Sequence, residues 1–169
     1  MTDAVEESLG ETQDVLVERS GVETRIELES AAVRRVLDGV TRAKEAGAAV
    51  ARVSLSLDEI RGTLDPSVLT LSLTPVLRDR AAHPEPYRVG SIGLYGLRRA
   101  SVAPAGGATR GLGYVLDVTP FFDQLATDPD AELDALMLSV RPRHALPDTA
   151  PITIGRIRIS ARYYASDAS

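Results

Sequence analysis

The sequence predicts a mainly β protein, an antiparallel β-sandwich of jelly-roll type with one long amphipathic helix and one short helix. Seven or eight short segments alternate apolar and polar residues with a period of two, and turns rich in glycine and proline separate them. Such half-buried alternation is typical of antiparallel sheets packed face to face. The length of 169 residues suffices for one well-buried core.

The N-terminal region differs from the rest of the chain in charge. Residues 1–29 carry nine acidic residues against two arginines, and residues 1–13 show no apolar period. We therefore expect an acidic, mobile head at 1–13, a single sandwich domain at 14–166 and a short tail at 167–169. The domain begins with two short strands, DVLVE at 14–18 and VETRIEL at 22–28, joined by a turn at Ser20-Gly21.

One segment, from Ser30 to Gly47, has the period of a helix. Ser30 suits the N-cap position and Gly47 suits the position just after the last turn. Its apolar stripe is formed by four residues at helical spacing, namely Val33, Val36, Leu37 and Val40. We expect this stripe to cover the sandwich.

The period then returns to two in six further segments. They are AVARVSLSLDEI (49–60), SVLTLSLTPVL (67–77), YRVGSIGLYG (87–96), GLGYVLDV (111–118), LDALMLSVRP (133–142) and ITIGRIRISARYY (152–164). Pro75 is expected to end or bulge its strand, because proline cannot donate a backbone hydrogen bond. Gly155 separates two isoleucine pairs of opposite parity, which predicts a bulge that re-aims the inward face. Thr119 and Pro120 suit the N-cap and first position of a short helix over 120–126.

Composition excludes several classes of chemistry. The chain contains no cysteine, which excludes disulfides, thiolate catalysis, zinc fingers and iron–sulfur clusters. The two histidines cannot build a histidine-rich metal centre, and the absence of tryptophan argues against stacking platforms for bases or sugars. The net charge of −5 gives no nucleic-acid footprint. No apolar run is long enough to span a membrane and the first residues do not resemble a signal peptide, so a cytoplasmic protein is expected.

No motif in the sequence points to catalysis or to a cofactor. His83 and His144 lie in proline-rich loops and are read as solvated side chains, with metal binding as the alternative reading. The acidic groups, Asp58-Glu59 and Asp128, Asp130 and Glu132, are read as turn and cap residues. The stretch GGATRGLG lacks the Lys-Ser/Thr of a phosphate loop and precedes a strand, which favours a hairpin connection.

Aromatic residues supply the candidates for partner contact or for covering a pocket. Phe121 and Phe122 are adjacent, so one ring is expected to face the core while the other is a candidate for contact with a partner. Tyr87 and Tyr95 lie near the two ends of the segment at 87–96 and are candidates for the same role.

The ordered series of C-terminal segments resembles the C-terminal domain of tyrosinases and polyphenol oxidases. The matching residues are Gly90-Ser91, Leu116 to Leu125, Leu138 to Arg143, and Ile152 to Ile159 within TIGRIRI. The resemblance covers residues 15–164. It implies a β-sandwich that packs over a helical copper domain and covers the entrance to a dinuclear copper site. The histidines of that copper domain have no counterpart here, so no catalytic residue carries over.

Three hypotheses follow. The resemblance implies a non-catalytic accessory subunit that binds a separate tyrosinase-like (type-3) copper oxidase and covers, chaperones or gates its site; copper would then belong to the partner. A structural module that forms homo-oligomers through its sheet edges is the first alternative. An enzyme or binding domain for a small metabolite, with no recognisable motif, is the second.

Overall fold

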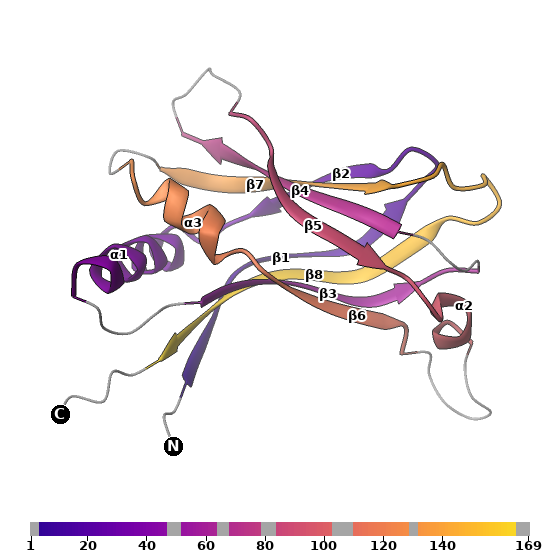
Figure 1. Ribbon diagram of the computed structural model, residues 1–169, viewed down its shortest axis with the longest axis horizontal. Coiled ribbons are helices and arrows are strands. Elements are labelled where there is room, and N and C mark those ends of the chain that lie inside the picture. The colour runs from indigo at the N-terminus through magenta and orange to yellow at the C-terminus, as the bar shows by residue number, and fades with distance from the viewer. Residues whose placement is uncertain are drawn as a thin grey trace.

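The computed structural model describes residues 4–46, 52–63, 68–78, 84–102, 110–128 and 132–164. These residues form two antiparallel four-stranded sheets packed face to face (Figure 1). Alternating apolar residues of the strands point between the sheets, as in β3, where Val53, Leu55 and Leu57 are fully buried. The mainly β, sandwich-type fold predicted from alternation is therefore confirmed.

The strand order is that of a jelly roll. The first sheet contains β1 (Ala4–Val17), β8 (Ile152–Tyr164), β3 (Arg52–Arg61) and β6 (Leu112–Asp117), in that order across the sheet. The second contains β2 (Val22–Glu27), β7 (Leu133–Pro142), β4 (Val68–Leu77) and β5 (Tyr87–Gly93). Among these strands only the β4–β5 connection stays within one sheet. Every other connection crosses from one sheet to the other, which ties the two layers together.

Helices lie at both ends of the sandwich. Helix α1 (Ser30–Ala46) and helix α3 (Thr119–Leu125) pack together at one end, and the short helix α2 (Leu97–Ala100) lies at the other (Figure 1). The α1 stripe is buried as predicted at Val33, Val36 and Val40. Helix α2 was not predicted, and Gly47 lies outside the described residues.

The expected N-cap of α3 is displaced by one residue. Val118 occupies the N-cap position, and Thr119 begins the helix. The Thr119 hydroxyl instead accepts a hydrogen bond from the Val53 backbone N–H of β3 at 2.9 Å. Thr119 therefore ties the start of α3 to the neighbouring strand, a long-range contact that local sequence does not reveal.

The expectation of a mobile acidic head at 1–13 is wrong for residues 4–13. They form most of β1, which pairs with β8 from Ala4↔Tyr164 to Val17↔Ile152. Leu9 is buried at a register shift in this ladder, and Gly10 crosses close to the β2 backbone at Glu27. Carboxylates of β1 pair with arginines of β8, so an acidic segment without apolar period still forms a strand.

Pro75 does not end its strand. It pairs with Leu136 inside β4, and the register shift in this ladder falls later, between Val76 and Leu77. The pairing of β4 with β5 begins only at Leu73↔Tyr87. No β5 residue is therefore paired with Pro75, and the missing N–H costs no hydrogen bond on that side.

The inward face of β8 changes at Gly155 as predicted, but without the expected change of register. Ile154 and Ile157 are both buried on either side of Gly155. The ladders with β1 and β3 keep one register across this point. The residues opposite Gly155, Asp14 and Glu59, both have positive φ, at 53° and 57°. The three strands therefore change face together without slipping against one another. The register shift at this row falls instead between β3 and its other neighbour, β6, from Leu57 to Ile60.

Candidate partner-binding site

The end of the sandwich that carries α2 displays side chains on a firmly anchored turn. Leu94 and Leu97 are fully buried on either side of the turn. The Ser101 hydroxyl donates to the Leu97 carbonyl at 2.6 Å and accepts from the Gly62 N–H at 2.9 Å. Gly96 has a φ of 78°, a conformation that glycine adopts at little cost. Local packing thus fixes α2 although it has only four residues.

Tyr95 projects outward between these two buried leucines. Its side chain is 72% exposed, and its ring lies over Gly93, where a Cβ atom would come within 2.8 Å of the Tyr95 Cε2. The Tyr114 hydroxyl donates to the Gly93 carbonyl from the other sheet. Glycine at 93 therefore leaves room for an exposed aromatic ring on a rigid base.

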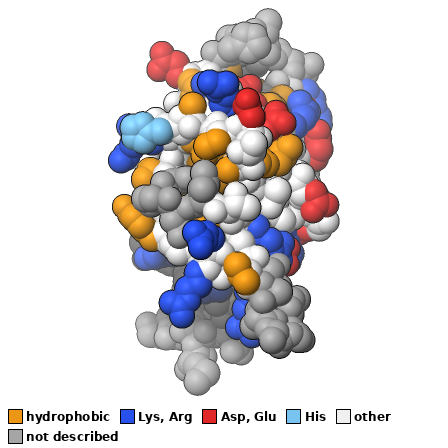
Figure 2. Space-filling view, turned by 90° about the vertical axis from the view of Figure 1, so that its right-hand side faces the viewer, with side chains coloured by type: hydrophobic (Ala, Val, Ile, Leu, Met, Phe, Trp, Pro, Cys, Tyr) orange, Lys and Arg blue, Asp and Glu red, His pale blue; other side chains and the backbone are white. Residues whose placement is uncertain are grey.

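A second exposed apolar side chain and three exposed arginines lie on α2 or directly beside it. Val102, just after α2, is 65% exposed. Arg98 and Arg99 lie on α2 and are exposed, as is Arg110, which the Gly111 N–H···O=C Ala100 bond at 3.1 Å holds beside the helix. We call these five residues, Tyr95, Arg98, Arg99, Val102 and Arg110, the α2-end surface. Figure 2 looks onto this end and shows hydrophobic side chains reaching the surface among basic and acidic ones.

The other aromatic candidates lie at the opposite end. Tyr87 begins β5 and is half-buried, with its ring centroid 5.6 Å from that of Phe121. Phe121 packs edge-on against Phe122 at 5.4 Å. Both phenylalanines are buried, so the expectation that only one ring faces inward is wrong. Helix α3 packs between β3 and α1, which offers apolar surroundings to two successive residues.

The structure describes one of the two histidines. His144 is exposed in the loop between β7 and β8, and His83 lies outside the described residues. Within the described ranges, no three His, Cys, Asp or Glu side chains form a group able to hold a metal ion. None of the described helices is long and apolar enough to cross a membrane.

Ion pairs cover the outer face of β1 and β8. Glu11 lies 3.0 Å from Arg156, and Glu6 lies 3.0 Å from Arg158. Glu7 contacts Arg35 of α1, and this hydrogen bond lowers the pKa of the Glu7 carboxyl. Burial, assisted by Glu7, raises the pKa of the neighbouring Tyr163 hydroxyl. The acidic residues of β1 thus act in strand pairing and helix docking.

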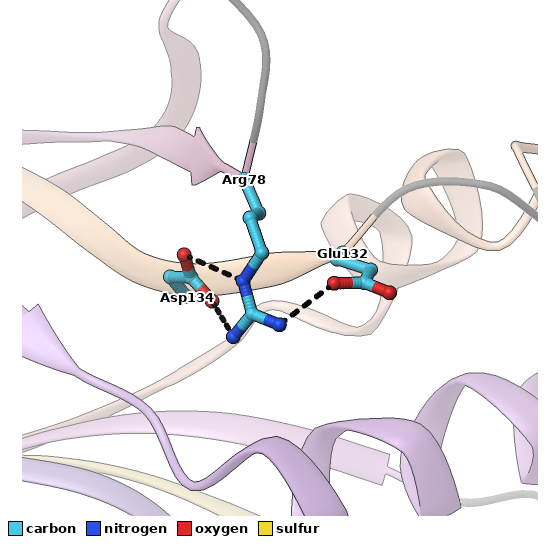
Figure 3. Close-up of polar contacts among 3 residues, drawn as sticks. All are labelled: Arg78, Glu132 and Asp134. Atoms are coloured by element: carbon cyan, nitrogen blue, oxygen red, sulfur yellow. Dashed lines mark hydrogen bonds and ion pairs between the residues drawn. The ribbon is translucent and has the colours of Figure 1, made fainter.

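A separate ion cluster joins the end of β4 to the start of β7 (Figure 3). The Arg78 guanidinium contacts Asp134 through Nη2 at 2.8 Å and Nε at 3.4 Å, and Glu132 through Nη1 at 2.9 Å. The Arg78 backbone N–H also donates to the Glu132 carbonyl at 2.8 Å. This geometry clamps two strands together. It gives a structural reading for Glu132, while Asp130 lies outside the described residues.

Sequence reasoning selected Tyr95 but missed the rest of the α2-end surface. Arg110 belongs to the stretch read as a hairpin connection, and Arg98, Arg99 and Val102 carry no motif. The available signal was the Leu-Tyr-Gly-Leu order at 94–97, in which a tyrosine stands between two leucines next to a turn glycine.

The fold and this surface define a jelly-roll β-sandwich domain with an exposed aromatic and arginine-rich end. The chain matches the family described as Domain of unknown function (DUF7868) over residues 5–162, and it belongs to that family. The match begins inside β1 and ends inside β8, so it spans both sheets. No curated protein matches the chain.

Proposed function

We propose that this protein is a non-catalytic accessory subunit that binds a separate tyrosinase-like copper oxidase through the α2-end surface. The observation that carries the proposal is Tyr95, which is 72% exposed between the fully buried Leu94 and Leu97. An exposed aromatic ring on a rigid base loses little conformational entropy when it is buried by a partner.

The composition of the α2-end surface supports protein binding. Tyrosine and arginine are enriched among the residues that contribute most to binding free energy at protein interfaces. Tyr95 and Val102 would supply the apolar centre, with Arg99 and Arg110 at its rim. Exposed arginines favour a partner with acidic groups around the contact, which would speed association.

The choice of a copper oxidase rests on the resemblance of residues 15–164 to the domain that covers the copper site in tyrosinases. A sandwich domain supplied as a separate chain could cover the site entrance, protect the apo-oxidase or gate the access of substrate. Copper would be held by the partner, and this chain would supply contact residues only. A cytoplasmic location is part of this proposal, and fractionation of the producing cells tests it.

Co-purification with a tyrosinase-like oxidase encoded beside this gene tests the proposal. The wild-type chain should form a complex with the oxidase, and Tyr95→Ser should weaken binding by about thirtyfold, the effect of losing a dominant interface residue. Arg99→Glu should slow association, more so at low salt. Val5→Ser changes a side chain of β1 that is 64% exposed and serves as the matched control. Absence of a complex with the wild-type chain, or equal binding by all variants, would overturn the proposal.

Copper content provides an independent readout. The oxidase produced with the wild-type chain should differ in copper content or phenol-oxidising activity from the oxidase produced alone. The Tyr95→Ser variant should remove that difference while Val5→Ser retains it. Equal copper content and activity in all preparations would exclude the covering, chaperone and gating roles.

A further inference from the structure

The outer edge of β6 has a different character from the other three sheet edges. Each sheet ends in two edge strands, β1 and β6 in the first sheet and β2 and β5 in the second. An edge strand exposes backbone N–H and C=O groups that pair readily with another strand, and proteins commonly block such edges with charges or bulges.

Charges or irregular backbone mark three of these edges. Strand β1 carries Glu6, Glu7 and Glu11, and it contains a register shift. Strand β2 reads Glu-Thr-Arg-Ile-Glu over 23–27. Strand β5 carries Arg88, and its ladder with β4 shifts between Leu71 and Ser72.

Strand β6 carries no charge along most of its length. Its sequence over 112–116 is Leu-Gly-Tyr-Val-Leu, and only Asp117 at its end is charged. Its ladder with β3 also contains a register shift, between Leu57 and Ile60, but the extra residue of this shift belongs to β3 and not to β6. Val115 is 71% exposed on the outer face of the sheet, so its apolar side chain is accessible along this edge. In the described part of the chain β3 is its sole ladder partner.

The ladder with β3 determines which backbone groups of β6 face outward. The Val118 N–H donates to the Val53 carbonyl at 2.8 Å, and Leu116 and Tyr114 follow in the same register opposite Leu55 and Leu57. Hydrogen-bonded pairs alternate along an antiparallel ladder. The backbone groups of the intervening residues, Gly113, Val115 and Asp117, therefore point to the open edge.

We propose that the β6 edge pairs antiparallel with β6 of a second copy, about a two-fold axis at Val115. This register places Val115 opposite Val115 of the partner subunit and Gly113 opposite Asp117 of the partner subunit. In this register Gly113, Val115 and Asp117 all form backbone hydrogen bonds with the same three residues of the partner subunit. Any other two-fold register would leave at least one of the three without such a partner. The pairing does not depend on the copper-oxidase role.

Side chains are compatible with this register. Asp117 meets a glycine, so no side chain crowds its carboxylate. The two Asp117 residues lie four positions apart along the ladder, roughly 13 Å at the strand rise. The two Val115 side chains pair across the axis on the outer face, which removes apolar surface from water.

Sedimentation of the full chain over a wide concentration range tests the pairing. The wild-type chain should show a monomer–dimer equilibrium. Val115→Lys should abolish the dimer, because two ammonium groups would stand directly opposite each other. A mixture of Val115→Lys with Val115→Glu should restore a heterodimer, which shows that both variants fold. Val5→Lys, on the opposite edge of the same sheet, should dimerise like the wild type.

A cysteine introduced at the axis tests the register. The chain has no cysteine, and directly opposite residues of a hydrogen-bonded pair lie about 5.5 Å apart, within disulfide range. Val115→Cys should form a covalent dimer under mild oxidation at least about tenfold faster than Val5→Cys, which reports random collisions. A wild-type chain that stays monomeric at every concentration would overturn the proposal. A dimer that persists in the Val115→Lys variant would also overturn the proposal. The same holds if a strand of another protein, and not of a second copy, pairs with β6.

Discussion

The side chain of Glu59 lies against Gly155 on the neighbouring strand, where a Cβ atom on residue 155 would come within 2.7 Å of the Glu59 Cβ. Glu59 has a φ of 57°, which costs free energy for a residue with a side chain. Asp14, on the other side of Gly155, has a φ of 53°. Along this row β1, β8 and β3 all change their inward face. Because Gly155 has no side chain, the Glu59 side chain can occupy the space beside it.

Gly155→Ala should lower the free energy of unfolding by about 1–3 kcal/mol, because the added methyl overlaps the Glu59 side chain. Glu59→Gly removes that side chain and the strain of positive φ, so it should rescue part of the loss in the double variant. Urea denaturation measures both effects. Gly113→Ala, whose added Cβ would meet the flexible Asp58 carboxylate at 3.3 Å, is the control and should change stability by about 0.5 kcal/mol or less. Strict additivity of the two changes would contradict the contact.

Leu9→Ala should lower the free energy of unfolding by about 2–5 kcal/mol, the range for removing a buried leucine side chain. Leu9 is 1% exposed although it lies within the acidic N-terminal segment. Val5→Ala in the same strand, at 64% exposure, should cost about 0.5 kcal/mol or less. Thermal and chemical denaturation compare the two. Equal stability of Leu9→Ala and the wild type would mean that residues 4–13 are not part of the folded sheet.

The Glu7–Arg35 pair should make stability depend on pH in the acidic range. Arg35 lowers the pKa of Glu7 in the folded protein. The stability contributed by the pair is therefore present above the unfolded pKa, about 4.3, and is lost as the pH falls through the folded value. Glu7→Gln should be less stable than the wild type at neutral pH, and the difference should shrink as the pH falls below 4.3. A double-mutant cycle with Arg35→Gln should be measured at neutral pH and at a pH below the folded pKa of Glu7. It should show a coupling free energy only at neutral pH.

Substitution of Phe122 should lower the free energy of unfolding, whereas substitution of Tyr95 should leave it nearly unchanged and weaken partner binding. Phe122→Ala should cost about 3–5 kcal/mol of stability, because Phe122 is fully buried. Tyr95→Ser should change stability by about 0.5 kcal/mol or less. Chemical denaturation measures the stability, and binding to an oxidase partner measures function. If Tyr95→Ser unfolded the protein, the ring would be a structural element and not a contact residue.

The alternation of polar and apolar residues predicted most strands closely. The expected segments at 133–142 and 152–164 coincide with β7 and β8. The failures have a common cause. Leu9, Thr119 and Pro75 each depend on a residue far along the chain. Gly10, next to Leu9, pairs with Ile159. The Val53 N–H donates to Thr119, and Pro75 pairs with Leu136. Local propensity carries no information about such partners.

The candidate site was only partly predictable for the same reason. Tyr95 could be selected as an aromatic residue next to a turn, but its exposure depends on Leu94 and Leu97 being buried from both sides. The buried pair Phe121 and Phe122 could not be separated from Tyr95 by composition, because all three are aromatic residues near an element boundary. Packing at the two ends of the sandwich makes the difference.

By itself the sequence determined the mainly β class, the helix at Ser30, and the position in β8 where the inward face changes, because each of these follows from spacing within one segment. The tertiary structure decided which strands are neighbours, which edges stay open and which aromatic ring reaches the surface. Ala4 pairs with Tyr164, at the other end of the chain. Pairings of this kind depend on the packing of two whole sheets, a property that no single segment contains.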